Sequence, residues 1–238
     1  MDQNDFYSQE RYAEQHSEYE SVGSYTAKTF LWMFLGLLTT FGIAVVGYVT
    51  GAVNFVYASP MIQIGLLVAE LAVVLFLTSL IHKLSVPAAR ALFFLYAAIN
   101  GVVFSTYFWL YDLTSLVLVF AATALYFGIL AAYGYLTHTD LSGLRTILMS
   151  GLIFLLVMAV LSLFLPMGAF DKAICLIGIA VFLGFTAYDT QKIRAYHAAY
   201  AHDPELAQKA SIFASLQLYL DFINLFLYLL RFLGKRKN

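Results

Sequence analysis

The sequence predicts an all-α integral membrane protein, and three observations lead to this class. Of the 238 residues, 62% are hydrophobic and only 11% are charged, whereas soluble domains are nearer half apolar and a quarter charged. Seven apolar stretches follow one another along the chain, each close to the roughly 20 residues that a bilayer-spanning helix needs. These stretches contain very few charged side chains. Soluble core helices would not be expected to show this pattern.

The predicted spans follow an acidic segment. Residues 1–28 have no apolar periodicity, and we expect them to form a mostly disordered N-terminal tail. The spans, in chain order, are residues 29–49, 61–81, 88–110, 115–136, 146–165, 173–189 and 211–233. Their connections are short except for residues 190–210, so residues 29–234 are expected to form one seven-helix bundle. Residues 235–238 are a short basic C-terminal tail.

The distribution of lysine and arginine predicts the orientation, because cytoplasmic loops are enriched in both. Most of the cations fall in the N-terminal tail and in the loops after the second, fourth and sixth spans, whereas the other loops hold only Lys172. The N-terminus of a multi-pass plasma-membrane protein is therefore expected in the cytoplasm. The basic residues from Arg231 to Lys237 conflict with this rule. The last span either crosses against the rule or re-enters.

The last span carries a polar stripe. Gln217, Asp221, Asn224, Tyr228 and Arg231 recur at steps of four and three, so they share one helical face. Lipid cannot satisfy such a stripe, which must face other helices or water. We therefore expect this helix towards the middle of the bundle. An amide would hold helices together as well as a carboxyl group does, so Asp221 indicates function, as intramembrane carboxylates commonly do.

Two further acids lie in apolar runs, and two interpretations stay open for each. Asp189 closes the sixth span just before Lys192 and Arg194. It is either an interfacial carboxylate paired with these bases or a partner of Asp221, since consecutive antiparallel spans can bring the two to similar depth. Glu70 in the second span is either a buried acid bonded to a neighbour or part of the same polar path.

Enzyme chemistry is not predicted. The sequence has no phosphate-binding glycine loop, nucleophile elbow or HExxH motif. The residues before Asp221 are Leu-Tyr-Leu, not the Gly-x-Gly of an intramembrane aspartyl protease. His138, His197 and His202 lack zinc-ligand spacing. We expect no resident cofactor, and a net charge of −1 gives no indication of a nucleic-acid partner.

The chain from about residue 25 to residue 234 resembles the transmembrane Bax inhibitor motif family (the Bax inhibitor-1 family), in its prokaryotic branch. The resemblance is carried by AYDTQ at residues 187–191, LYLDFINLF at 218–226, YLTHTDLSG at 135–143 and Asn100-Gly101. It implies a bacterial inner-membrane protein with six helices around a central seventh. It also implies that Asp189 and Asp221 form a hydrogen-bonded pair that senses pH and gates a calcium leak.

The resemblance assigns roles to further residues. Glu70 matches an acidic position of the second helix, and His82 stands where a prokaryotic relative has an arginine that latches one aspartate. We therefore expect a pH-sensitive calcium leak in which Asp189 and Asp221 bind calcium transiently, since calcium prefers oxygen ligands. Glu70, Asn100, Gln217, Asn224 and Arg231 would form the polar network. The alternative is a non-transporting regulator that binds a membrane protease or another membrane protein.

Overall fold

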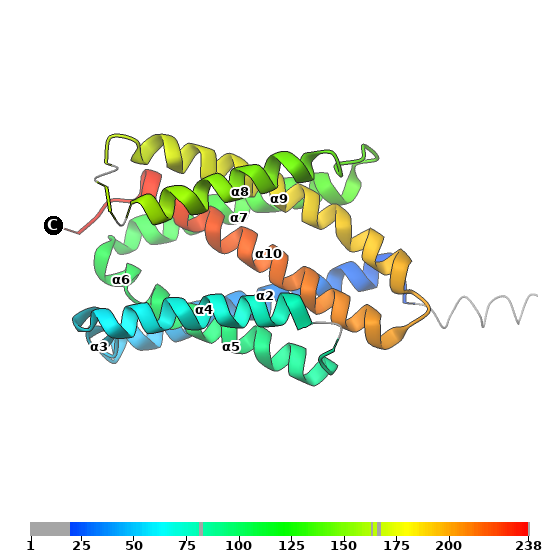
Figure 1. Ribbon diagram of the computed structural model, residues 1–238, viewed down its shortest axis with the longest axis horizontal. Coiled ribbons are helices and arrows are strands. Elements are labelled where there is room, and N and C mark those ends of the chain that lie inside the picture. The colour runs from blue at the N-terminus through cyan, green and yellow to red at the C-terminus, as the bar shows by residue number, and fades with distance from the viewer. Residues whose placement is uncertain (1–19, 81–82, 163, 166–167, 238) are drawn as a thin grey trace, which may run out of the picture.

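The computed structural model describes residues 20–80, 83–162, 164–165 and 168–237. Within these residues the chain is built from helices (Figure 1), which confirms the all-α class. The helices are α2 (Val22–Val49), α3 (Val53–Ala58), α4 (Pro60–Leu80), α5 (Val86–Phe104), α6 (Tyr107–Leu110), α7 (Leu113–Leu136), α8 (Leu144–Leu161), α9 (Asp171–Tyr200) and α10 (Pro204–Leu233).

Side-chain caps define where several helices begin. The hydroxyl of Ser21 accepts a hydrogen bond from the Ser24 backbone N–H at 3.2 Å, and Ser85 and Asp112 cap α5 and α7 in the same way. Asp203 caps α10 through two backbone N–H groups, with Pro204 in the first turn. Capping oxygens satisfy N–H groups that have no partner within the helix. Residues 22–28, expected in the tail, therefore belong to α2, and residues 1–19 lie outside the described residues.

The predicted membrane spans are confirmed for six helices, which are long and apolar enough to cross a bilayer. In α4 the apolar stretch, Pro60–Phe76, is shorter than in these six helices. The membrane crossing expected at residues 61–81 therefore stays a prediction. The third span is broken between α5 and α6. There the hydroxyls of Ser105 and Thr106 bond to the carbonyls of Val102 and Val103, which competes with the helical pattern.

The connection between the last two helices is much shorter than expected. Residues 190–210 were predicted as a loop, but α9 continues to Tyr200 and α10 begins at Pro204. Hydropathy marks where a helix leaves the apolar layer, whereas polar residues such as Gln191 and Lys192 remain good helix formers beyond it. The prediction of a long loop was wrong for this reason.

Helix α10 lies in the middle of the bundle and contacts α2, α5, α7 and α9. Figure 1 shows it crossing between the other helices. Most of the largest fully buried side chains belong to it, among them Tyr219 and Phe226. Helices α4 and α8 pack mainly on α5 and α9, respectively. A central C-terminal helix is thus found, and the complete ring of six helices stays a prediction.

Helix α10 runs from one end of the bundle to the other. Its 30 residues form one unbroken helix, about 45 Å long at 1.5 Å per residue. The described chain begins at one end of the bundle and finishes at the other (Figure 1). At the far end, the Asp112 N–H donates to the Lys235 carbonyl at 2.9 Å. Within α10 the chain does not turn back, and the helix is long and apolar enough for a full crossing. We call the end at Ser21 the N-end and the end at Lys235 the C-end.

Candidate functional site

The two aspartates lie on neighbouring helices. Asp189 is in the N-end half of α9 and Asp221 is on α10, which packs against α9 more extensively than against any other helix. Both side chains are buried, with 6% and 4% of their surface exposed, respectively. The two carboxyl groups interact electrostatically. The structure therefore brings together the two acids that the sequence singled out.

Asp189 has polar partners on both helices. Its Oδ1 accepts hydrogen bonds from Lys192 Nζ and from Gln217 Nε2, each at 3.4 Å. The Lys192 ammonium also lies 5.3 Å from the ring centroids of Tyr188 and Tyr196, a distance at which aromatic faces attract cations. The Tyr196 hydroxyl donates to Gln217 Oε1 at 3.4 Å. Asp189 thus belongs to a group of side chains that joins α9 to α10.

In the described part of the chain, the carboxyl group of Asp221 has fewer hydrogen-bond partners than that of Asp189. Its Oδ2 is buried and has no hydrogen-bond partner among the described residues. The resemblance implied a direct hydrogen bond between the two carboxyl groups, but the hydrogen bonds of the described residues do not include one. A buried polar atom without a partner is uncommon and calls for a functional or structural reason.

The polar stripe of α10 continues from Asp221 towards the C-end. Asn224, Tyr228 and Arg231 line a cavity of about 380 Å³ together with Tyr107, Tyr111 and three further residues. Asn224 lies three residues after Asp221, which is close to one helical turn. The stripe therefore connects the buried aspartates to a cavity near the C-end. Arg231 also forms an ion pair with Asp171 at the start of α9.

Glu70 and Asn100 do not join the aspartate pair. Glu70 Oε1 is buried without a partner among the described residues, and the groups that interact with it electrostatically include Tyr96 and Tyr219. Asn100 Nδ2 donates to the Tyr96 carbonyl at 3.2 Å. These residues form a second polar centre between α4, α5 and α10. The hydrogen bonds between described residues do not join Glu70 or Asn100 to the aspartates. The single network that the sequence suggests stays a prediction, and His82 lies outside the described residues.

A cation at the aspartate pair would need further oxygen ligands. Among the described residues, no group of three or more His, Cys, Asp or Glu side chains is placed to hold a metal ion. Amide oxygens of Gln217 and Asn224 are the nearest candidates along the stripe. Because Lys192 already contacts Asp189, an incoming cation would compete with its ammonium.

Lys192, Tyr188 and Tyr196 contribute more to the site than their sequence pattern led us to expect. Lys192 was expected only as an interfacial base, and the tyrosines were given no role. The signal was present, because residues 188, 192 and 196 recur at steps of four and so share one face of α9. Arg194, the other expected partner of Asp189, donates instead to the Thr137 carbonyl at 2.9 Å.

This arrangement defines a multi-pass helical membrane protein with a buried carboxyl pair between its last two helices. Comparison of its sequence with known proteins identifies the family. Residues 22–238 match the family described as "Inhibitor of apoptosis-promoting Bax1", and the chain belongs to this Bax inhibitor-1 family.

Three bacterial relatives are similar over nearly their whole length. The "Inner membrane protein YbhL" of Escherichia coli is 39% identical over 216 residues, which cover 90% of this chain and 92% of the relative. A protein of Rickettsia prowazekii is 37% identical over 92% of each chain. A protein of Borreliella burgdorferi is 36% identical over 90% of this chain and 93% of its own.

Proposed function

We propose that this protein is a pH-sensitive cation leak in which Asp189 and Asp221 act as the proton-sensing gate. The observation that carries the proposal is the buried, unpartnered Oδ2 of Asp221 beside a second carboxyl group. Intramembrane carboxyl groups commonly mark proton or ion pathways. The pair also stands between the C-end cavity and the polar side chains on α9.

The gate follows from the electrostatics of two neighbouring acids. Two carboxyl groups in a low-dielectric interior cannot both ionise without strong repulsion, so one proton is shared within the pair. In that state the hydrogen bond from Gln217 to Asp189 joins α10 to α9. Loss of the proton leaves two like charges, which either repel each other or bind a cation. Lys192 offsets part of this charge from the side of Asp189.

The polar stripe supplies a path for the cation. The C-end cavity reaches Asn224, and Asp221 lies one turn further along the same face. Beyond the pair, Gln217 and Lys192 continue the polar surface towards the N-end. An opening movement would therefore displace the contacts between α9 and α10 around the two aspartates.

Calcium is the cation that we propose as cargo. Calcium takes oxygen ligands such as carboxylates and amide carbonyls and tolerates irregular geometry, which suits Asp189, Asp221 and the amides of the stripe. The choice of calcium among the hard cations rests on the family resemblance.

Flux into vesicles that contain only this protein tests the proposal. We expect purified protein to raise calcium permeability over that of empty liposomes, with a dependence on pH between about pH 5 and about pH 8. Equal leakage from protein-containing and empty vesicles would contradict the leak. The protein would then be a regulator that acts through another membrane protein.

We also propose that the N-end faces the cytoplasm of the bacterial inner membrane. The N-end carries most of the lysine and arginine residues, in accord with the bias of cytoplasmic loops, and a relative is named as an inner membrane protein. In a Cys175→Ser background, His202→Cys in the α9–α10 turn should resist an impermeant thiol reagent in intact cells. Lys235→Cys, exposed at the C-end, should react. The reverse pattern would overturn the orientation.

A further inference from the structure

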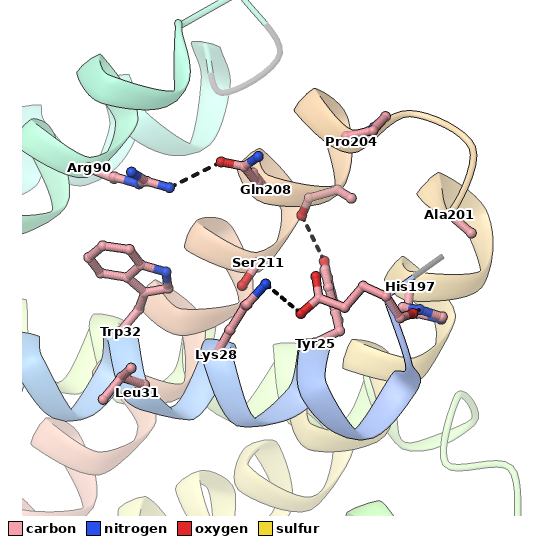
Figure 2. Close-up of a pocket in the computed structure, with 12 residues that line it drawn as sticks. Tyr25, Lys28, Leu31, Trp32, Arg90, His197, Ala201, Pro204, Gln208 and Ser211 are labelled. Atoms are coloured by element: carbon pink, nitrogen blue, oxygen red, sulfur yellow. Dashed lines mark hydrogen bonds and ion pairs between the residues drawn. The ribbon is translucent and has the colours of Figure 1, made fainter. Parts of the chain in front are cut away.

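A second cavity lies at the N-end, away from the aspartate pair. It has a volume of about 490 Å³ and is enclosed by side chains of α2, α5, α9 and α10. Figure 2 shows Lys28 and Trp32 of α2 facing Arg90 of α5 and Gln208 of α10 across this space. Four helices thus contribute to one pocket at the boundary of the predicted membrane layer.

Arg90 gives the pocket a cation with one unpaired donor among the described residues. Its Nη2 donates to Gln208 Oε1 at 3.1 Å, while its buried Nε has no partner among the described residues. The guanidinium lies over the Trp32 ring at 4.8 Å from the centroid. The ion pairs between described residues provide no carboxylate for Arg90. Within the part of the chain that the structure describes, no carboxylate therefore pairs with its positive charge.

Lys28 adds a second cation, which is only partly engaged. Its Nζ lies 2.7 Å from Glu20 Oε1, and 61% of its side chain is exposed. Burial alone would raise the pKa of Glu20, but hydrogen bonds from Lys28 and Ser24 outweigh it, so the pKa lies below its usual range. The single negative charge of Glu20 thus stands beside the two positive charges of Lys28 and Arg90. The described residues that line the pocket therefore carry a net positive charge.

One wall of the pocket leads directly to the apolar outer face of α2. Leu31 lines the pocket and is 54% exposed. Phe34 and Leu38 are also exposed and continue this face at helical spacing. Trp32 stands at the junction, and tryptophan is enriched at the headgroup level of membranes. A ligand with a negative head and an apolar tail matches both parts of this surface.

We infer that the N-end pocket binds an anionic phospholipid from the adjacent leaflet. The phosphate lies between Arg90 and Lys28, and an acyl chain follows Leu31, Phe34 and Leu38. The fork of N–H donors on a guanidinium matches phosphate oxygens, and basic pockets between membrane helices are known to take lipid headgroups. A bound lipid would clamp α2 and α5 to the first turns of α10. This site is independent of the aspartate gate.

Lipid titration by native mass spectrometry tests the site. Full-length protein in neutral detergent is titrated with phosphatidylglycerol, phosphatidylcholine or soluble glycerol phosphate. We expect phosphatidylglycerol to bind and Arg90→Gln to weaken its binding about fivefold, as expected for loss of one cation near a lipid headgroup. Arg145→Gln should bind like the wild type, because Arg145 is an exposed arginine at the same end outside the pocket.

A second variant and two competing ligands complete the test. Lys28→Gln changes an exposed side chain, so it tests the pocket even where Arg90→Gln unfolds, and we expect about twofold weaker binding. Equal binding of phosphatidylcholine, or unchanged binding in both pocket variants, would overturn the inference. Competition by glycerol phosphate at the concentrations that suffice for phosphatidylglycerol would also overturn it, since the site would then take a soluble phosphate.

Discussion

Asp221 is a buried acid and Glu70 a half-buried one, and each has a buried oxygen that lacks a partner among the described residues, yet their surroundings differ. Asp221 faces a second carboxyl group and, beyond it, the Lys192 ammonium. Glu70 interacts electrostatically with the phenol groups of Tyr96, Tyr107 and Tyr219. The charge of Asp221 depends on the charges of its two ionisable neighbours. The tyrosines around Glu70, in contrast, stay neutral near pH 7. Burial of a carboxyl group alone is therefore a weak criterion for a sensor.

The two regions also differ in how closely their helices approach. A Cβ atom on Gly134 of α7 would collide with the Ala187 carbonyl of α9, two residues before Asp189. Gly65 of α4, five residues before Glu70, has no atom within 4 Å of an added Cβ. Helix α9 is thus in close backbone contact with α7 beside Asp189. The glutamate lies on a helix with free space at this position.

The largest predicted effect tests this difference in packing. Gly134→Ala should lower the free energy of unfolding by about 2–3 kcal/mol, because the added methyl group has to displace backbone atoms. Gly65→Ala should be neutral or stabilising by about 0.5–1 kcal/mol, since it removes backbone freedom from the unfolded chain. Denaturant unfolding in detergent measures both. Equal stability of the two variants would show that α7 and α9 are not in close contact.

The next prediction concerns the charged neighbours. Lys192→Met removes a cation that favours the ionised form of the nearby carboxyl groups, so the pair should release its proton only at higher pH. We expect the midpoint of the flux–pH curve to rise by about one pH unit. Glu70→Gln, as the matched control, should leave the midpoint in place. A shift in Glu70→Gln with none in Lys192→Met would move the sensor to the second centre.

The smallest predicted effect concerns the exposed end of the polar stripe. Arg231 forms its ion pair with Asp171 where both side chains are partly exposed, at 40% and 31%. Exposed ion pairs contribute little, so Arg231→Gln should change the free energy of unfolding by less than about 1 kcal/mol. A loss well above this value would mean that the stripe is equally constrained along its whole length.

Six apolar helices and the burial of two acids within them could be predicted from the sequence, because both signals are strong locally. Apolar length marks a span, and an acid inside a span stands out against it. The ends of α9 and α10 are missed because Asp203 and Pro204 mark a turn only once the chain on both sides is known to be helical.

The division of polar residues into two centres depends on which helices pack together. Glu70 on α4 and Asp221 on α10 occupy similar apolar runs, and their spacing in the sequence does not reveal that α4 packs on α5 while α10 packs on α9. The position of Lys192 between two tyrosines depends on side-chain direction in the same way.

Calcium flux through the double variant Asp189→Asn, Asp221→Asn tests the central claim most directly. Asparagine keeps the size and hydrogen bonding of a protonated aspartic acid but cannot ionise. In liposomes, we expect this variant to remain folded and to lose the pH dependence of flux, whereas each single variant should shift it. Glu70→Gln should respond like the wild type. A normal pH response in the double variant would contradict the account, because the sensor would then lie outside the aspartate pair.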